Sequence, residues 1–314
     1  MNNEYFGKFL QELRISRNMT REQLAKDICT PKQIYRIEKG VYEPSLYLIN
    51  QLSIKFNMDL NEYFKTYFAN NSIIGLEGVN AINAAIERED VQLLKSLIDK
   101  YEKLEDFKKG ENLQCICYGN ALCSALIEKD YKTSLEYCYK GIQIECPNFS
   151  VDNISKFTYS NVGITLITCI SQNYFAMNQF TVGMNVLFGL LEVLETYILN
   201  APYPMFQAPQ FSKKIYQGVL YNISAHLLNK GDLEDALHYV EKGLQFSIKE
   251  YNLRFLPDLT YMKFKILYKE QNYSEAKEYY NRTVYLYKIT NKDDKLTELE
   301  ESAGIEYPEI FTEN

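Results

Sequence analysis

Three side chains of the types that read DNA bases fall close together in the sequence: Lys32, Gln33 and Arg36. Lys32 and Arg36 are four residues apart and Gln33 lies three before Arg36, so on a helix all three project from nearly one face. Glutamine can pair bidentately with adenine, and arginine or lysine with guanine. The spacing therefore predicts a surface that hydrogen-bonds to base edges in the major groove.

The surrounding residues predict short helices that would position this trio. Thr20 with Gln23 and Thr30 with Gln33 each match a capping box, in which the threonine hydroxyl accepts the N3 amide of the helix. We expect helices over 21–27 and 31–39, the second begun by a proline and stopped at Gly40. A helical apolar stripe precedes them over residues 6–13, a further helix follows Pro44-Ser45, and one more is expected over 61–68. Side chains beside the base-reading face are expected to contact phosphates, namely Thr20, Arg21, Thr30, Tyr35 and Lys39.

Residues 5–64 resemble the lambda-repressor-like (Xre) DNA-binding domain. The resemblance rests on Thr20–Ala25, on Ile34–Gly40 and on Pro44-Ser45 with the Leu/Ile helix that follows. It implies a helix-turn-helix and an internal ion pair between Arg14 and Glu38, which would hold the domain together rather than contact DNA. Pro31 departs from the pattern, because it removes a side chain that could reach a base in relatives.

The charge is unevenly divided along the 314 residues, whose formal net charge is −7. Residues 1–66 carry ten Lys/Arg and eight Asp/Glu, whereas the remainder carries 24 and 33. A basic head on an acidic body makes DNA contact plausible for the head alone. Length and a 46% apolar share predict about two domains with ample core.

The sequence offers little chemistry for an enzyme, so we expect none. Seven cysteines without a CxxC pair and only two histidines, His226 and His238, give no metal-ligand spacing, and no phosphate-binding glycine loop is present. We expect no metal, no cofactor and unpaired thiols of a reducing compartment. The start lacks the pattern of a secretory signal, and polar residues interrupt the uncharged stretch 157–191, so we expect a cytoplasmic protein without a membrane span.

The body contains an internal repeat. Residues 135–143 recur as 237–245, each after a two-residue turn signal whose second member we call the turn anchor. Small residues follow the clearest anchors by three positions, which lets two antiparallel helices approach closely. The pattern resembles degenerate tetratricopeptide (TPR) repeats, with a generic helical bundle as the alternative. We expect an all-α chain with a right-handed superhelix of helical hairpins, and anchors at residues 91, 131, 180, 233 and 273.

The first helix of each TPR pair lines a concave face that binds extended peptides. Counting eleven residues back from the anchors gives asparagine in three of five cases, and its amide can pair with a peptide's N–H and C=O together. The predicted peptide-binding residues are Asn80, Asn83, Asn120, Gln172, Tyr221, Asn222, Asn229, Tyr261, Lys265, Tyr268 and Lys269.

An Xre-type head on a TPR body resembles the RRNPP superfamily, with the layout of its PlcR-like and Rgg-like members. The resemblance implies a homodimeric, quorum-sensing transcription factor that binds double-stranded DNA under the control of a short signalling oligopeptide. The alternative is a TPR scaffold or antagonist that binds a protein partner without peptide control. The expected division is a DNA-binding domain over 1–66, a linker over 67–75, a sensing and dimerisation domain over 76–300 and an acidic tail over 301–314. That tail is either a solvated end or a final capping segment.

Overall fold

Helices joined by turns and loops make up the chain where the computed structural model describes it, which is over residues 4–61, 73–199 and 210–311. No strand occurs within those ranges. The chain divides into two compact units, residues 1–144 and 145–314. The all-α class expected from the sequence is confirmed.

The first unit begins with the predicted helix-turn-helix. Its helices are α1 (Glu4–Ser16), α2 (Arg21–Ala25), α3 (Pro31–Glu38) and α4 (Leu46–Phe56). Apolar side chains from all four form one buried core, because each helix carries its stripe on the face that meets the others. The helix expected over 61–68 lies outside the described residues except for Asn61, and most of the expected linker over 67–75 does too.

Two helical hairpins complete the first unit. The first pairs α6 (Ile73–Glu87) with α7 (Val91–Tyr101), and the second pairs α8 (Gly110–Cys123) with α9 (Tyr131–Ile142). A 3₁₀ turn over Glu105–Phe107 joins the hairpins. A π-helical segment, Ser124–Glu128, continues α8 up to the turn.

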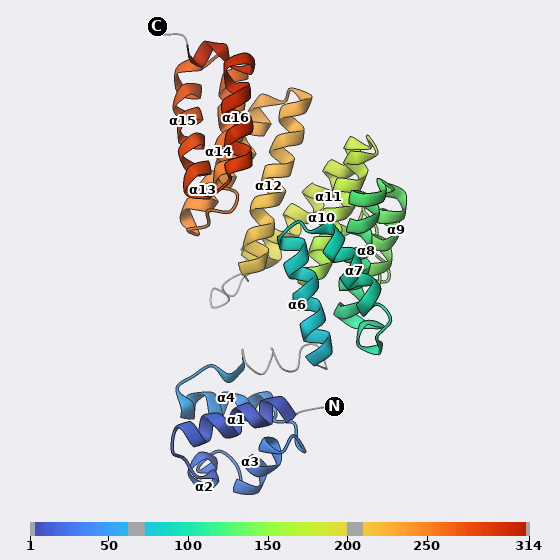
Figure 1. Cartoon of the computed structure of the whole chain (residues 1–314), viewed down its shortest axis with the longest axis vertical. Helices are drawn as coiled ribbons and strands as arrows, with labels where there is room; N and C mark the ends of the chain where they lie inside the picture. The colour runs from blue at the N-terminus through green and yellow to red at the C-terminus, as the bar shows by residue number, and fades with distance from the viewer. Residues whose placement is uncertain (1–3, 62–72, 200–209, 312–314) are drawn as a thin grey trace. The chain divides into compact units, whose positions relative to one another are not determined.

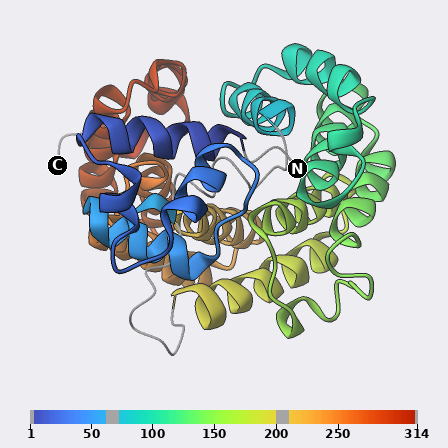
Figure 2. The same cartoon turned by 90° about the horizontal axis from the view of Figure 1, so that it is seen from below.

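The second unit stacks three more hairpins and a last helix. The pairs are α10 (Asn161–Ala176) with α11 (Phe180–Val193), α12 (Gln210–Lys230) with α13 (Leu233–Lys249), and α14 (Leu256–Lys269) with α15 (Tyr273–Ile289). The chain ends in α16 (Asp293–Glu306) and a 3₁₀ turn over Pro308–Ile310. The partners of each hairpin run side by side (Figure 1 and Figure 2), and α12 contacts both α10 and α14, so first helices adjoin first helices.

The five turn anchors expected from the sequence are all the first residues of second helices, so the helix-pair interpretation is confirmed. Two residues before each anchor the backbone adopts the left-handed conformation, at Glu89, Lys129, Asn178, Gly231 and Gln271. This conformation ends a helix by satisfying its last carbonyls, and the next residue then starts the following helix. A sixth turn of the same kind at Asn291 begins α16.

The described part of the expected acidic tail packs on the last hairpin. Ala303, Tyr307 and Ile310 are buried in a cluster with Leu299 and with Phe264 of α14. The sequence left a solvated end and a capping segment open because acidic residues surround these apolar positions on α16. Over residues 301–311 the segment therefore caps the hairpin.

The remaining expectations on composition concern thiols and membranes. All seven cysteines are free, and six of them are buried. Among the described helices none is long and apolar enough to cross a membrane.

Candidate nucleic-acid interface and peptide-binding face

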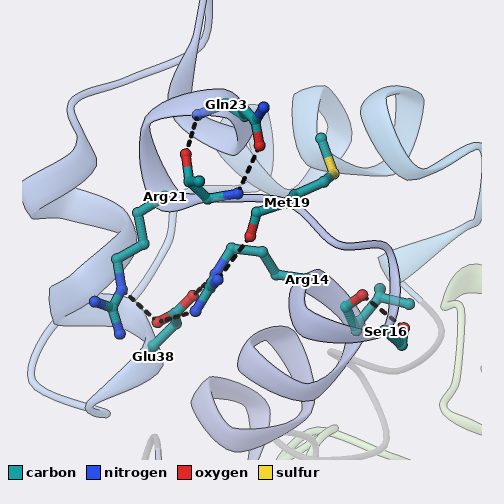
Figure 3. Close-up of polar contacts among 8 residues, drawn as sticks. Arg14, Ser16, Met19, Arg21, Gln23 and Glu38 are labelled. Carbon is teal, nitrogen blue, oxygen red and sulfur yellow. Dashed lines mark hydrogen bonds and ion pairs between the residues drawn. The ribbon is translucent and has the colours of Figure 1, made fainter.

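A buried ion-pair network fixes α3 within the head (Figure 3). Glu38, at 2% exposure, accepts from Arg14 at 2.5 Å and from Arg21 at 2.7 Å. Arg14 also donates to the Met19 carbonyl at 2.8 Å, which ties the end of α1 to the start of α2. The predicted pair between Arg14 and Glu38 is confirmed. Arg21 also joins this pair, which the residue pattern did not predict.

The two predicted capping boxes are both present. The Thr20 and Thr30 hydroxyls accept the N3 amides at 3.2 Å, and the Gln23 and Gln33 side chains accept the threonine amides in return. The carboxamide oxygen of Gln33 is therefore occupied, since it accepts the Thr30 N–H at 3.0 Å. Bidentate pairing of Gln33 with adenine would require this capping bond to break.

Three cations remain exposed on or next to α3: Lys32, Arg36 and Lys39. The only carboxylate on α3 is Glu38, which is buried and neutralised, so its charge does not oppose them. Tyr35 is exposed beside the Arg21 guanidinium, 5.1 Å from its ring, and Arg36 lies 5.4 Å from the ring of Tyr42. Tyr42 is a neighbour that sequence spacing gave no signal for, because it lies beyond the helix end.

None of the eleven predicted peptide-binding residues is buried. Those of the second unit lie on first helices, with Gln172 on α10, Asn222 and Asn229 on α12, and the rest on α12 or α14. Partial burial raises the pKa of Tyr221 and of Tyr261, so both phenols stay protonated and can donate hydrogen bonds. The adjacent helices α10, α12 and α14 thus offer amide and hydroxyl groups along one row.

Contacts within the chain engage several of the predicted residues on α14. Tyr268 packs on Tyr307 with ring centroids 4.9 Å apart, and its hydroxyl donates a hydrogen bond to Glu309. Loss of solvent around the Tyr268 hydroxyl, and to a smaller extent this hydrogen bond, raises the pKa of Tyr268 to about 12. Lys265 stacks on the Tyr261 ring, and Lys269 donates to the Leu228 carbonyl at 3.4 Å. The expected grip of a carboxylate by Lys265 and Lys269 would have to compete with these contacts.

The stretch between Asn120 and its turn anchor is not α-helical throughout. The count of eleven residues crosses the π-helical segment Ser124–Glu128, whose i→i+5 bonding takes one extra residue, whereas α12 has no such segment after Asn222. Asn120 lines a cavity bounded by α8, α9 and the segment after α7, together with Lys103 and Lys140.

Two family models match the chain in separate regions. A helix-turn-helix model matches residues 10–63, and the RNPP family C-terminal domain matches residues 205–298. The two matches lie in the order that the RRNPP resemblance predicts, with the helix-turn-helix first and the RNPP family C-terminal domain after it. Among curated protein sequences none matches.

Solved structures share the fold over nearly the whole chain. Bacillus thuringiensis PlcR in complex with the peptide PapR7 and DNA has a TM-score of 0.72 at 16% identity, covering 95% of this chain and 98% of that one. The Streptococcus dysgalactiae SHP pheromone receptor Rgg2 has 0.64 at 16%, covering 94% and 97%. ComR from S. thermophilus, with DNA and its signalling peptide ComS, has 0.60 at 18%, covering 94% and 97%. At these identities the likeness establishes the fold.

Proposed function

We propose that the chain is a cytoplasmic transcriptional regulator that binds operator DNA as a homodimer and responds to a short signalling peptide. The observation that carries the proposal is one chain with exposed cations on a capped, rigidly held α3 and an RNPP family C-terminal domain. The matched PlcR and ComR structures contain DNA and a signalling peptide, which supports both halves of the proposal.

In the DNA complex, Lys32 and Arg36 contact base edges while Thr20, Thr30 and Lys39 contact phosphates. Arg36 enters from the exposed face of α3, and Arg21 can offer its remaining donors to a phosphate while its Nε holds Glu38. Gln33 has a mainly capping role, and its amide nitrogen is left to donate to a base. Two heads are needed because half-sites lie a helical turn or more apart.

Gel shifts with DNA from upstream of the protein's own gene test this assignment. Binding should weaken steeply with salt, since each neutralised phosphate releases counterions. Lys32→Ala combined with Arg36→Ala should abolish preference for the operator, because each bidentate base contact contributes about 1–3 kcal/mol of discrimination. Lys277→Ala, which removes one exposed cation from α15, is the control. Unchanged operator affinity in the double variant would refute the DNA assignment.

Peptide binding is proposed along the row of first helices, with Asn222 and Asn229 of α12 at its centre. The peptide must prefer one arrangement of the two heads, since a ligand shifts an equilibrium only by its differential affinity. Asn222→Ala should weaken peptide binding measured by calorimetry, whereas Asn281→Ala on the second helix α15 should not. Equal peptide affinity in both variants would refute the proposed face.

The second candidate function is that of a scaffold that binds a protein partner. An exposed apolar face on α13, α14 and α15 favours it. Ile248 and Tyr285 are 68% and 67% exposed, and both border a cavity of about 570 Å³ shared by α13, α14 and α15. Exposed apolar surface of this kind marks protein contacts. Light scattering of the double variant Ile248→Asp with Tyr285→Asp distinguishes self-association from binding of another protein. Loss of the dimer assigns this face to self-association. A dimer that stays intact assigns the face to a different protein partner.

A further inference from the structure

The cavity beside Asn120 has the composition of a small-ligand site. It has a volume of about 370 Å³ and lies among the segment after α7, one face of α8, and α9. Leu113 and Ile116 of α8 give it an apolar wall, and Asn120 lies on the same face one and two turns further along. Pockets of a few hundred cubic ångströms with an apolar wall and a few convergent polar groups are typical of small-ligand sites.

Four polar side chains around this cavity have no partner within the described chain. Lys103, Asn120, Tyr137 and Lys140 each line it, and none makes a hydrogen bond or ion pair with another described residue. The neighbouring Lys108 differs, because it donates to the Glu102 carbonyl at 2.5 Å. Asn120 and Tyr137 are half-buried, whereas Lys103 and Lys140 are exposed. All four converge on one space beside an apolar wall, and this combination points to a ligand.

The charge around the cavity selects an anion. Lys103, Lys108 and Lys140 face a single carboxylate, Glu102, although the chain after residue 66 is acidic as a whole. Two free ammonium groups with an amide and a phenol can together donate to both oxygens of a carboxylate. The apolar wall then accommodates an attached hydrocarbon group.

A π-helical segment lies next to the site. Ser124–Glu128 directly follows α8, whose residues Leu113, Ile116 and Asn120 line the cavity, and it continues the helix up to Lys129. Single π-helical turns within α-helices are frequent at functional sites.

We propose that this cavity binds a carboxylate that carries a small apolar group, held by Lys103, Lys140 and Asn120. The site is built from the first unit alone, from elements other than α10, α12 and α14, and its use by a free acid does not depend on the proposed function. Two sources share this chemistry: a free small organic acid, and the C-terminal residue of a peptide.

Calorimetry and ligand-detected NMR on the full chain test the proposal with N-acetyl-L-phenylalanine as the probe and its amide as the uncharged analogue. The acid should bind and the amide should bind at least about tenfold more weakly, because a hydrogen bond to a charged group is lost. Lys103→Gln and Lys140→Gln should each weaken the acid about tenfold. Lys132→Gln, an exposed lysine on the same helix as Lys140, should leave the affinity unchanged.

The source follows from a second pair of probes. An acetylated tripeptide that ends in phenylalanine with a free carboxylate should bind more tightly than N-acetyl-L-phenylalanine if the site takes a peptide end, and no more tightly if it takes a free acid. Either order supports a carboxylate site. Absence of acid binding at millimolar concentration, equal binding of acid and amide, or equal affinity in all three lysine variants would overturn the proposal.

Discussion

The two arginines that share Glu38 make a matched test of how the head is held together. Arg14 and Arg21 both donate to this carboxylate, but the Arg14 side chain is 10% exposed and that of Arg21 is 32% exposed. Removing one partner of a buried ion pair costs about 3–5 kcal/mol, whereas a solvent-screened pair contributes about 1 kcal/mol or less. Arg14→Leu should therefore destabilise the head by about 3 kcal/mol. We take the low end of the range because Arg21 still pairs with Glu38 in this variant.

Arg21→Leu should cost about 1 kcal/mol, so the two variants should differ by about 2 kcal/mol, or about thirtyfold in an opening equilibrium. Hydrogen exchange of the α1 and α3 amides in the full chain measures this locally, without assuming that the whole molecule unfolds in one step. Arg14→Leu with Glu38→Leu should recover much of the loss, because no buried charge is left unpaired. Equal protection in the two single variants would refute the reasoning, since it would mean that burial does not set the strength of the network.

Two further predictions concern the second unit. A Cβ at Gly243 would lie 2.9 Å from the Leu259 side chain, so Gly243→Ala should lower the free energy of unfolding by about 1–2 kcal/mol in urea titrations. Gly304→Ala, where nothing lies within 4 Å, should raise it by about 0.5–1 kcal/mol, and the same sign for both would contradict the packing argument. His226 stacks on Phe175, and burial lowers its pKa from 6.5, so the folded state favours the neutral ring. Its contribution to stability is complete above pH 6.5 and declines as the pH falls below that value. His226→Leu should flatten the loss of stability between pH 7 and pH 5, and an unchanged slope would show that His226 is not its source.

The features that were predicted correctly from the sequence are those determined by a few adjacent residues. Thr20 and Thr30 start their helices because the residues three positions on complete the caps, and each hairpin turn is set by two neighbouring residues. The single long-range success, the Arg14–Glu38 pair, came from a family resemblance rather than from spacing.

The features that the sequence did not predict have equally physical causes. The count to Asn120 left out the π-helical turn, because such a turn leaves no clear mark in residue types and counting assumes a constant rise per residue. The engagement of Tyr268 by Tyr307 and Glu309 depends on a segment about forty residues away, whose apolar stripe sits among acidic residues. Local sequence patterns thus locate the helices and turns. Which helix face is exposed, and which side chains remain without a partner, depends on tertiary contacts.

Coupling between peptide and DNA tests the central claim most directly. The measurement is the anisotropy of labelled operator DNA titrated with the chain, with and without a synthetic peptide taken from the end of a small open reading frame beside the gene. We predict a change in operator affinity of about fivefold or more, and the same factor in the affinity for the peptide when DNA is present. Operator binding that no such peptide changes, in a chain that binds the peptide, would contradict the account.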